Sequence, residues 1–257
     1  MRTLAGLTKF VLFVFHTIFC SLVHLLVSGF IRLFKGNQVK WNRNLVRFWA
    51  FGVTVIFNIK IDKKGSAPVP PFILVSNHLS YIDIIPVFLH TKGTFVAKRE
   101  VRNWPFIGFM IEMVGIIFVD RRIKKDLLRV NDELKPACNE HQGIVFFPEG
   151  TTSAGEKVLH FKPSLLEMAA TEGVEVSYAS IQYRTHPKDE PAVNSVCFFG
   201  ARDSFPGHLL KMAKNREIYC TIRFGEERIQ SNTRKDLAKQ LQKRVESIFI
   251  PTHIGRK

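Results

Sequence analysis

The sequence predicts an α/β domain with a mixed, largely parallel sheet flanked by helices, preceded by an N-terminal membrane-associated helical segment. Three observations predict it. An uncharged apolar run near the N-terminus is long enough for a membrane helix. Beyond Phe57, short β-rich runs alternate with helical stretches, which is typical of α/β sheets. The chain is 46% hydrophobic, enough to bury a large core, although its net charge is +15. We expect residues 1–54 to form the membrane-associated helices and residues 55–257 the α/β domain.

The uncharged run extends from Phe10 to Ile31 and would measure about 30 Å as a helix. A signal peptide or a buried core helix could share its composition, but its length, its phenylalanines and its flanking charges favour a membrane helix. Two basic residues precede the run and five follow it up to Arg47, which places the body of the protein in the cytoplasm, at the inner or cytoplasmic membrane. Residues Trp41–Thr54 predict an interfacial or packing helix. Periodicity leaves open whether the first helix spans the bilayer or dips into one leaflet.

The charge distribution and the cysteines narrow the range of partners. The first 61 residues hold eight basic and no acidic residues, and the stretch from Arg223 to the end has a net charge of +5, whereas the middle is nearly neutral. Charge that flanks apolar segments suits an anionic lipid surface, so membrane lipids are the expected partner and nucleic acid is not. The four cysteines have no close spacing, which predicts buried thiols in a reducing compartment and no metal site.

The elements of the body follow one another in a regular order. The expected strands are Phe57–Ile61, Phe72–Ser76, Phe95–Ala97, Ile116–Val119, Ile144–Phe147, Val176–Tyr183, Val193–Phe199 and Tyr219–Phe224. The expected helices are Tyr81–Leu89, Phe106–Met113, Lys124–Glu140, Pro163–Glu172 and a terminal helix with Leu237, Leu241 and Val245 at helical spacing. Functional residues of such sheets gather at the carboxyl ends of the strands.

An imidazole and a carboxylate follow the strand expected at Phe72–Ser76. Ser80 and Asp83 have the spacing of a capping box, so a helix should begin at Tyr81 and leave His78 on an exposed turn. Asp83 can then fold back to one ring nitrogen, which fixes the tautomer and supports the cation that forms when the other nitrogen accepts a proton. No Gly-x-Ser-x-Gly elbow accompanies the pair, so it suits activation of a hydroxyl on the substrate itself.

Three further segments should reach comparable strand ends. Gly115–Arg121 delivers an acid and a cation, and Phe146–Ser153 ends in a Pro-Glu-Gly turn whose hydroxyls and amides could hold an anion or a hydroxyl. Val176–Tyr183 is the third. Taken singly, each has an ordinary interpretation: Arg121 as a surface ion-pair partner, and Glu149 as a turn or cap residue.

The four segments in this order resemble the glycerolipid acyltransferase family, which includes the 1-acylglycerol-3-phosphate acyltransferases and their lysophospholipid relatives. Asn77-His78 to Asp83 is similar to the family's NHxxxxD block. Gly115–Arg121 is similar to the second block, Phe147–Ser153 to the third and Val176–Tyr183 to a degraded fourth. The resemblance covers about Phe72 to Tyr183 and implies that residues 55–257 form an acyltransferase domain. It implies transfer of an acyl group from acyl-CoA or acyl carrier protein, a co-substrate and not a bound cofactor, to the free hydroxyl of a lysolipid.

The resemblance also implies roles for individual residues. His78, held by Asp83, would act as general base without an acyl-enzyme. The implied substrate-binding residues are Asn77, Lys98, Arg121, Glu149, Gly150, Thr151 and Lys162. The foremost acceptor is 1-acylglycerol-3-phosphate, which gives phosphatidic acid. Thr152 stands where the family often has an arginine for the acceptor phosphate, so lyso-ornithine lipid or another lysophospholipid is the alternative. A thioester or lipid hydrolase and a non-enzymatic lipid-binding membrane protein are alternatives of other classes.

Overall fold

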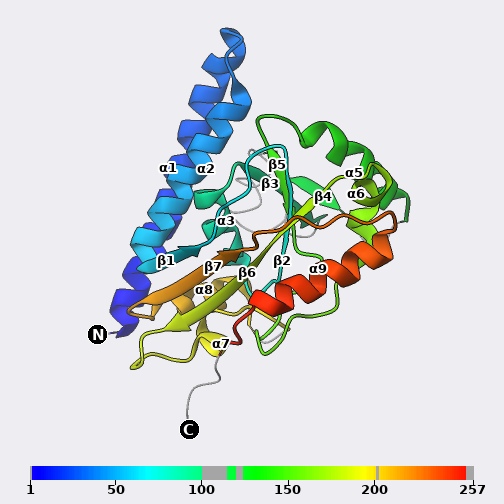
Figure 1. Ribbon diagram of the computed structural model, residues 1–257. Helices are drawn as coiled ribbons and strands as arrows, with labels where there is room; N and C mark the ends of the chain where they lie inside the picture. The colour runs from blue at the N-terminus through cyan, green and yellow to red at the C-terminus, as the bar shows by residue number, and fades with distance from the viewer. Residues whose placement is uncertain (1, 100–114, 120–123, 201–202, 253–257) are drawn as a thin grey trace.

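The computed structural model of the protein describes residues 2–99, 115–119, 124–200 and 203–252. Its centre is a seven-stranded sheet with the order β1-β7-β6-β2-β5-β3-β4 (Figure 1). All neighbouring strands are parallel except β6 and β7, which confirms the predicted mixed, largely parallel sheet. The strands are β1 (Ile59–Lys64), β2 (Ile73–Ser76), β3 (Gly93–Lys98), β4 (Ile117–Val119), β5 (Gly143–Phe146), β6 (Val176–Thr185) and β7 (Ile218–Phe224).

Helices cover both faces of the sheet, because neighbouring residues of a strand point to opposite sides and both sides are apolar here. In β2, Leu74 joins one buried cluster, whereas Ile73 and Val75 join the other. The first cluster includes residues of α1 (Arg2–Leu33), α2 (Gln38–Phe57), α3 (Ile84–His90) and α8 (Phe205–Ala213). The second includes residues of α5 (Lys124–Ala137), α6 (Glu167–Thr171) and α9 (Arg234–Ile248). The 3₁₀ segments η1 (Tyr81–Asp83) and η3 (Pro163–Leu166) precede α3 and α6.

One predicted strand is wrong. Residues 193–199 were expected to be extended, but they begin within a short helix, α7 (Ala192–Ser195), and continue as a loop. Pro191 occupies the N-cap, and the amides of Val196 and Cys197 both donate to the carbonyl of Ala192, which closes a helical turn. Val193 and Val196 are therefore buried, and Phe198 and Phe199 half-buried, without joining the sheet. The helix predicted at 106–113 lies outside the described residues.

The first two helices form an antiparallel hairpin that extends past the sheet (Figure 1). A polar seam joins them: Trp49 Nε1 donates to Thr17 Oγ1 at 3.2 Å, and His16 Nε2 lies 3.1 Å from the Trp49 carbonyl. The His16 imidazole packs directly against Gly52 of α2, where an added Cβ would lie 2.2 Å from His16 Nε2. The N-terminal end of α1 is held to the body, since Lys9 Nζ donates to the Asn215 carbonyl at 2.6 Å.

Candidate functional site

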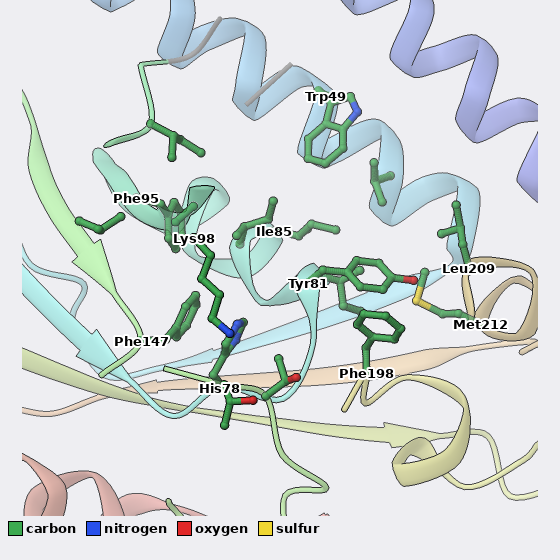
Figure 2. Close-up of a pocket in the computed structure, with 18 of the residues that line it drawn as sticks. Trp49, His78, Tyr81, Ile85, Phe95, Lys98, Phe147, Phe198, Leu209 and Met212 are labelled. Atoms are coloured by element: carbon green, nitrogen blue, oxygen red, sulfur yellow. The ribbon is translucent and has the colours of Figure 1, made fainter. Parts of the chain in front are cut away.

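A cavity of about 270 Å³ opens where the carboxyl ends of three parallel strands meet (Figure 2). His78 follows β2, Lys98 ends β3 and Phe147 follows β5, and all three side chains line the cavity. This is the edge at which an α/β sheet is expected to gather functional groups. Most other lining side chains are apolar, so the site combines a few polar groups with a hydrophobic chamber.

His78 and Asp83 form a close pair in this cavity. Asp83 Oδ2 lies 2.7 Å from His78 Nδ1 and also accepts hydrogen bonds from the amides of Leu79 at 2.7 Å and Ser80 at 3.0 Å. The Asp83 side chain is 0% exposed, whereas that of His78 is 21% exposed. Two backbone donors therefore fix the carboxylate, the carboxylate fixes Nδ1 as the protonated nitrogen, and Nε2 is left to accept a proton.

Phe147 fixes the plane of the imidazole. Its ring stacks on His78 with the centroids 4.0 Å apart and the planes 3° from parallel. Phe95 stacks on the Phe147 ring in turn, with the two ring centroids 5.8 Å apart. Together with the Asp83 hydrogen bond, this stack restrains the direction of Nε2. Phe147 was not predicted as a site residue, because a phenylalanine at the end of a buried strand cannot be told from an ordinary core residue.

Asn77 joins strands and does not face the cavity. Its side chain is buried, its Nδ2 donates to the Ile181 carbonyl at 2.9 Å, and its Oδ1 accepts from the Ile181 amide at 2.8 Å. These two bonds continue the pairing of β2 with β6 beyond Ser76. Asn77 thus anchors the turn that carries His78. That it also binds substrate stays a prediction.

The predicted turn after β5 supplies a second wall. Gly150, Thr151 and Thr152 line the cavity, and Gly150 has a φ of 72°, in the left-handed region that glycine tolerates. The amide of Ser153 donates to the His78 carbonyl at 3.0 Å, which holds this turn against the turn that carries His78. The structure therefore brings the first and third predicted segments together.

Glu149 lies behind the cavity wall and is 2% exposed. Its Oε1 accepts from the Leu159 amide at 3.2 Å, whereas Oε2 has no hydrogen-bond partner among the residues that the structure describes. Burial raises the pKa of this carboxyl to about 8. Glu149 was expected to bind substrate, but its surroundings suit a carboxyl that braces the turn from inside.

This environment predicts how stability depends on pH. The folded-state pKa of Glu149 lies above its ordinary value of 4.5. The stability that the neutral Glu149 carboxyl contributes to the fold is therefore fully present below about pH 4.5 and is lost as the pH rises through about 8. Glu149→Gln removes the buried charge, so it should be more stable than wild type by about 4 kcal/mol at pH 9 and by less than about 1 kcal/mol at pH 5. Thermal unfolding at both pH values measures this, with Glu226→Gln, an exposed position, as control. Equal Tm differences at pH 5 and pH 9 would contradict it.

The three predicted cations have different outcomes. Lys98 lines the cavity, and Figure 2 shows its side chain extending from β3 into it. Lys162 is exposed and is not among the lining residues; its amide donates to the Pro148 carbonyl at 2.9 Å. Arg121 lies outside the described residues. Lys98 is therefore the predicted cation that the described structure brings to His78.

The N-terminal hairpin forms part of the cavity wall. Phe13 of α1 and Trp49, Val53 and Phe57 of α2 line it, together with Leu209 and Met212 of α8. A membrane helix and an interfacial or packing helix were predicted here, but no local pattern in the sequence shows that residues so distant from His78 line the same cavity. The hairpin therefore contributes apolar surface to the same cavity as the His78 imidazole.

Known proteins resemble this chain in sequence. The model of the family described as Acyltransferase matches residues 58–181. The lyso-ornithine lipid O-acyltransferase of Pseudomonas aeruginosa is 30% identical over 222 residues, which cover 86% of this chain and 84% of that protein. The 1-acyl-sn-glycerol-3-phosphate acyltransferase of Neisseria meningitidis is 30% identical over 134 residues, which cover 51% of this chain and 52% of that protein.

A solved structure shares the fold. The crystal structure of the 1-acyl-sn-glycerophosphate (LPA) acyltransferase PlsC from Thermotoga maritima superimposes with a TM-score of 0.60 at 22% sequence identity. The match covers 96% of this chain and 98% of that one, so it includes the N-terminal hairpin as well as the sheet.

Proposed function

Because the chain belongs to the acyltransferase family, we propose that it is a lysolipid O-acyltransferase, which moves an acyl group from a thioester to the free hydroxyl of a lysolipid. The observation that carries this proposal is the His78–Asp83 pair, with Nε2 free to accept a proton, at an apolar cavity. Relatives named for two different lysolipid acceptors support the same reaction class.

The pair suits direct transfer. His78 Nε2 takes the proton of the lysolipid hydroxyl while that oxygen attacks the thioester carbonyl, and Asp83 stabilises the imidazolium that forms. The tetrahedral intermediate then collapses and the carbon–sulfur bond breaks. The departing sulfur takes the proton from Nε2, so the donor leaves as the free thiol. Lys98 and Thr151 line the same cavity and could face the developing oxyanion. The donor is acyl-CoA or an acyl carrier protein that carries the acyl group as a thioester.

The apolar wall gives the acyl chain a place to lie. Phe13, Trp49 and Phe57 on the hairpin side and Leu209 and Met212 on the α8 side offer carbon surface on two sides of the cavity. Each methylene that leaves water contributes about 0.8 kcal/mol. Binding energy from the chain would thus hold the carbonyl beside His78, where the hydroxyl must attack.

Thr152 bears on the choice of acceptor. It lines the cavity, so a hydroxyl stands at the place where a guanidinium could hold a phosphate monoester through two hydrogen bonds. The lyso-ornithine lipid O-acyltransferases of Pseudomonas aeruginosa and Brucella abortus match 86% and 88% of this chain, whereas the Neisseria meningitidis relative matches 51%. We favour lyso-ornithine lipid as acceptor, with 1-acylglycerol-3-phosphate as the second candidate.

An acceptor panel tests both points. Purified wild type should acylate lyso-ornithine lipid with a higher kcat/KM than 1-acylglycerol-3-phosphate. Thr152→Arg should shift this ratio toward the phosphate acceptor about tenfold, because a charge-assisted bidentate contact is gained, whereas the uncharged control Thr152→Gln should not. A reversed preference in wild type would make 1-acylglycerol-3-phosphate the acceptor. Release of free fatty acid at the same rate with and without any acceptor would indicate a hydrolase and overturn the proposed function.

The hairpin is the proposed membrane contact. By length and composition α1 could cross a bilayer, and many of its large apolar side chains, such as Phe15, Phe19 and Leu26, are exposed. Its N-terminal end, however, is bonded to the body, and α2 returns antiparallel to the same body. We therefore infer that the hairpin rests in one leaflet, with the body in the cytoplasm, because a crossing α1 would force the Arg-containing α2 to cross as well.

Labelling distinguishes the two arrangements. In a cysteine-free background, Lys35→Cys at the tip of the hairpin and Lys188→Cys on the body should react with a membrane-impermeant maleimide only from the cytoplasmic side. Both positions are exposed, so each introduced thiol can react when the maleimide is present on its own side of the membrane. Reaction of the Lys35→Cys variant only from the opposite side would show that α1 crosses.

A further inference from the structure

A buried polar layer lies beneath the catalytic pair, on the side away from the cavity. Asp83 Oδ2 has three donors, but Oδ1 is buried without a hydrogen-bond partner among the residues that the structure describes. The Tyr183 hydroxyl, on a residue that is 1% exposed, is also buried without a partner there. Unpaired buried oxygens of this kind are rare and costly, so two in one core require an explanation.

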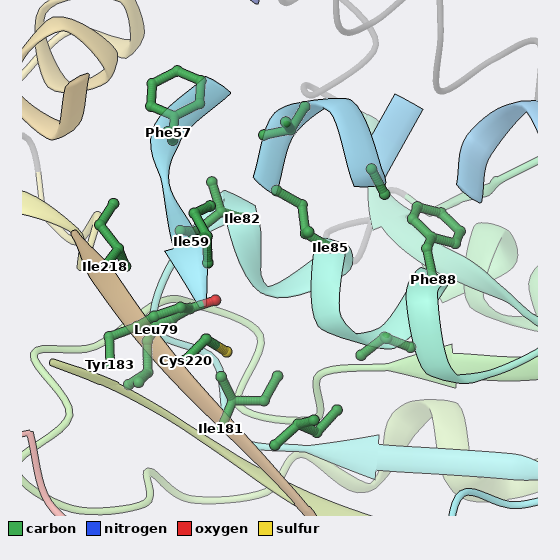
Figure 3. Packing of buried hydrophobic residues seen from close by; sticks show 14 of the residues in the cluster. Phe57, Ile59, Leu79, Ile82, Ile85, Phe88, Ile181, Tyr183, Ile218 and Cys220 are labelled. Atoms are coloured by element: carbon green, nitrogen blue, oxygen red, sulfur yellow. The ribbon is translucent and has the colours of Figure 1, made fainter. Parts of the chain in front are cut away.

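The strands bring these two oxygens to the same place. Asn77 binds the backbone of Ile181, and Tyr183 lies two residues further along β6, so its side chain is on the same face of the sheet as that of Ile181. The η1 segment that carries Asp83 packs on this face. Figure 3 shows Tyr183 beside Leu79 and Cys220, beneath the segment that carries Ile82.

The protonation states of Tyr183 and its neighbours allow the Tyr183 hydroxyl to donate a hydrogen bond to the Asp83 carboxylate. Burial raises the pKa of the Tyr183 hydroxyl, and the Asp83 carboxylate raises it further, so the hydroxyl keeps its proton. Burial and Asp83 likewise raise the pKa of the Cys197 and Cys220 thiols, which stay neutral. Within the described part of the chain, His78 and Glu149 are the other titratable groups that face Asp83.

We propose that the Tyr183 hydroxyl donates a hydrogen bond to Asp83 Oδ1 and is a positioning residue for the His78–Asp83 pair. Each buried oxygen then gains the partner that it lacks. The bond holds the carboxylate from below while the amides of Leu79 and Ser80 hold it from the side, and it moderates the negative charge that Oδ2 presents to the imidazole. Tyr183 itself does not line the cavity and touches no substrate.

Tyr183→Phe tests this proposal, which rests on the proposed acyl transfer. We expect kcat to fall roughly tenfold with both KM values unchanged, because a bond to a charged group is lost while the cavity is intact. The acidic limb of the kcat/KM profile should move to higher pH by about half a unit, since the unshielded carboxylate favours the imidazolium more strongly. The matched control is Tyr178→Phe, on the same strand but in the opposite core cluster, which should change neither quantity.

A second readout needs no turnover. The midpoint of the His78 ring titration, followed by NMR and assigned by its loss in His78→Ala, should rise in Tyr183→Phe and not in Tyr178→Phe. An unshifted midpoint, or a pH profile that matches wild type, would overturn the role of Tyr183. If wild type shows no acyl transfer to any acceptor, the proposed function fails while the ring titration still decides this proposal.

Discussion

His78→Ala should lower kcat for acyl transfer by about a thousandfold with little change in KM for either substrate. The variant loses the group that accepts the hydroxyl proton, and general-base catalysis by a positioned side chain is typically worth about 10²–10⁴ in rate. Binding should persist, because the apolar walls of the cavity come from other residues. Initial rates over a matrix of donor and acceptor concentrations measure both parameters.

The fold should survive this change. Asp83 Oδ2 keeps its two backbone donors, from Leu79 and Ser80, when the imidazole is absent. The unfolding temperature and the far-UV spectrum check this, and His141→Ala, which changes an exposed histidine outside the cavity lining, provides the matched control. If His78→Ala turns over at the wild-type rate, the imidazole is not the base and the mechanism fails.

Asp83→Asn should lower kcat by about a hundredfold to a thousandfold, also at nearly constant KM. The asparagine oxygen can accept from the two amides, but it carries no charge to stabilise the imidazolium. If the amide group turns its nitrogen toward Nδ1, the proton moves to Nε2 and the ring is left in the wrong tautomer for a base. The same rate matrix measures the loss, and it should persist across the pH range.

The control for this substitution is Asp62→Asn, at an exposed carboxylate that pairs with Lys64 on β1. It should behave as wild type in rate and in unfolding temperature. Full activity of Asp83→Asn would remove the carboxylate from the mechanism while leaving His78 as base. A folded Asp83→Asn protein with a raised KM and an unchanged kcat would instead indicate a binding role.

Most of the fold could be predicted because its signals are local. Short β-rich runs mark the seven described strands, and the spacing of Ser80 and Asp83 predicted both the helical turn and the approach of Asp83 to His78. The segment at 193–199 was mistaken for a strand since its composition suits a buried strand as well as a buried turn. There the short α7 helix that begins after Pro191 decided the outcome.

The parts of the site that could not be predicted depend on contacts distant in sequence. Asn77 carries a residue type suited to substrate binding, but its partner, the backbone of Ile181, follows only from the pairing of β2 with β6. In the sequence, Phe147 and Tyr183 cannot be told from ordinary core aromatics. Only the fold places Phe147 against His78 and Tyr183 beneath Asp83. The contribution of Trp49 to the cavity likewise depends on how the hairpin docks.

The most direct test of the central claim, that His78 activates the acceptor hydroxyl for direct transfer, is thiol release from acyl-CoA or acyl carrier protein with and without the lysolipid. We predict that thiol appears only with the acceptor, in step with the acylated product, and that the intact mass of the protein incubated with donor alone is unchanged. A burst of thiol without acceptor, equal in amount to the protein and matched by an acyl group in its mass, would contradict the account, because it would show a covalent acyl-enzyme.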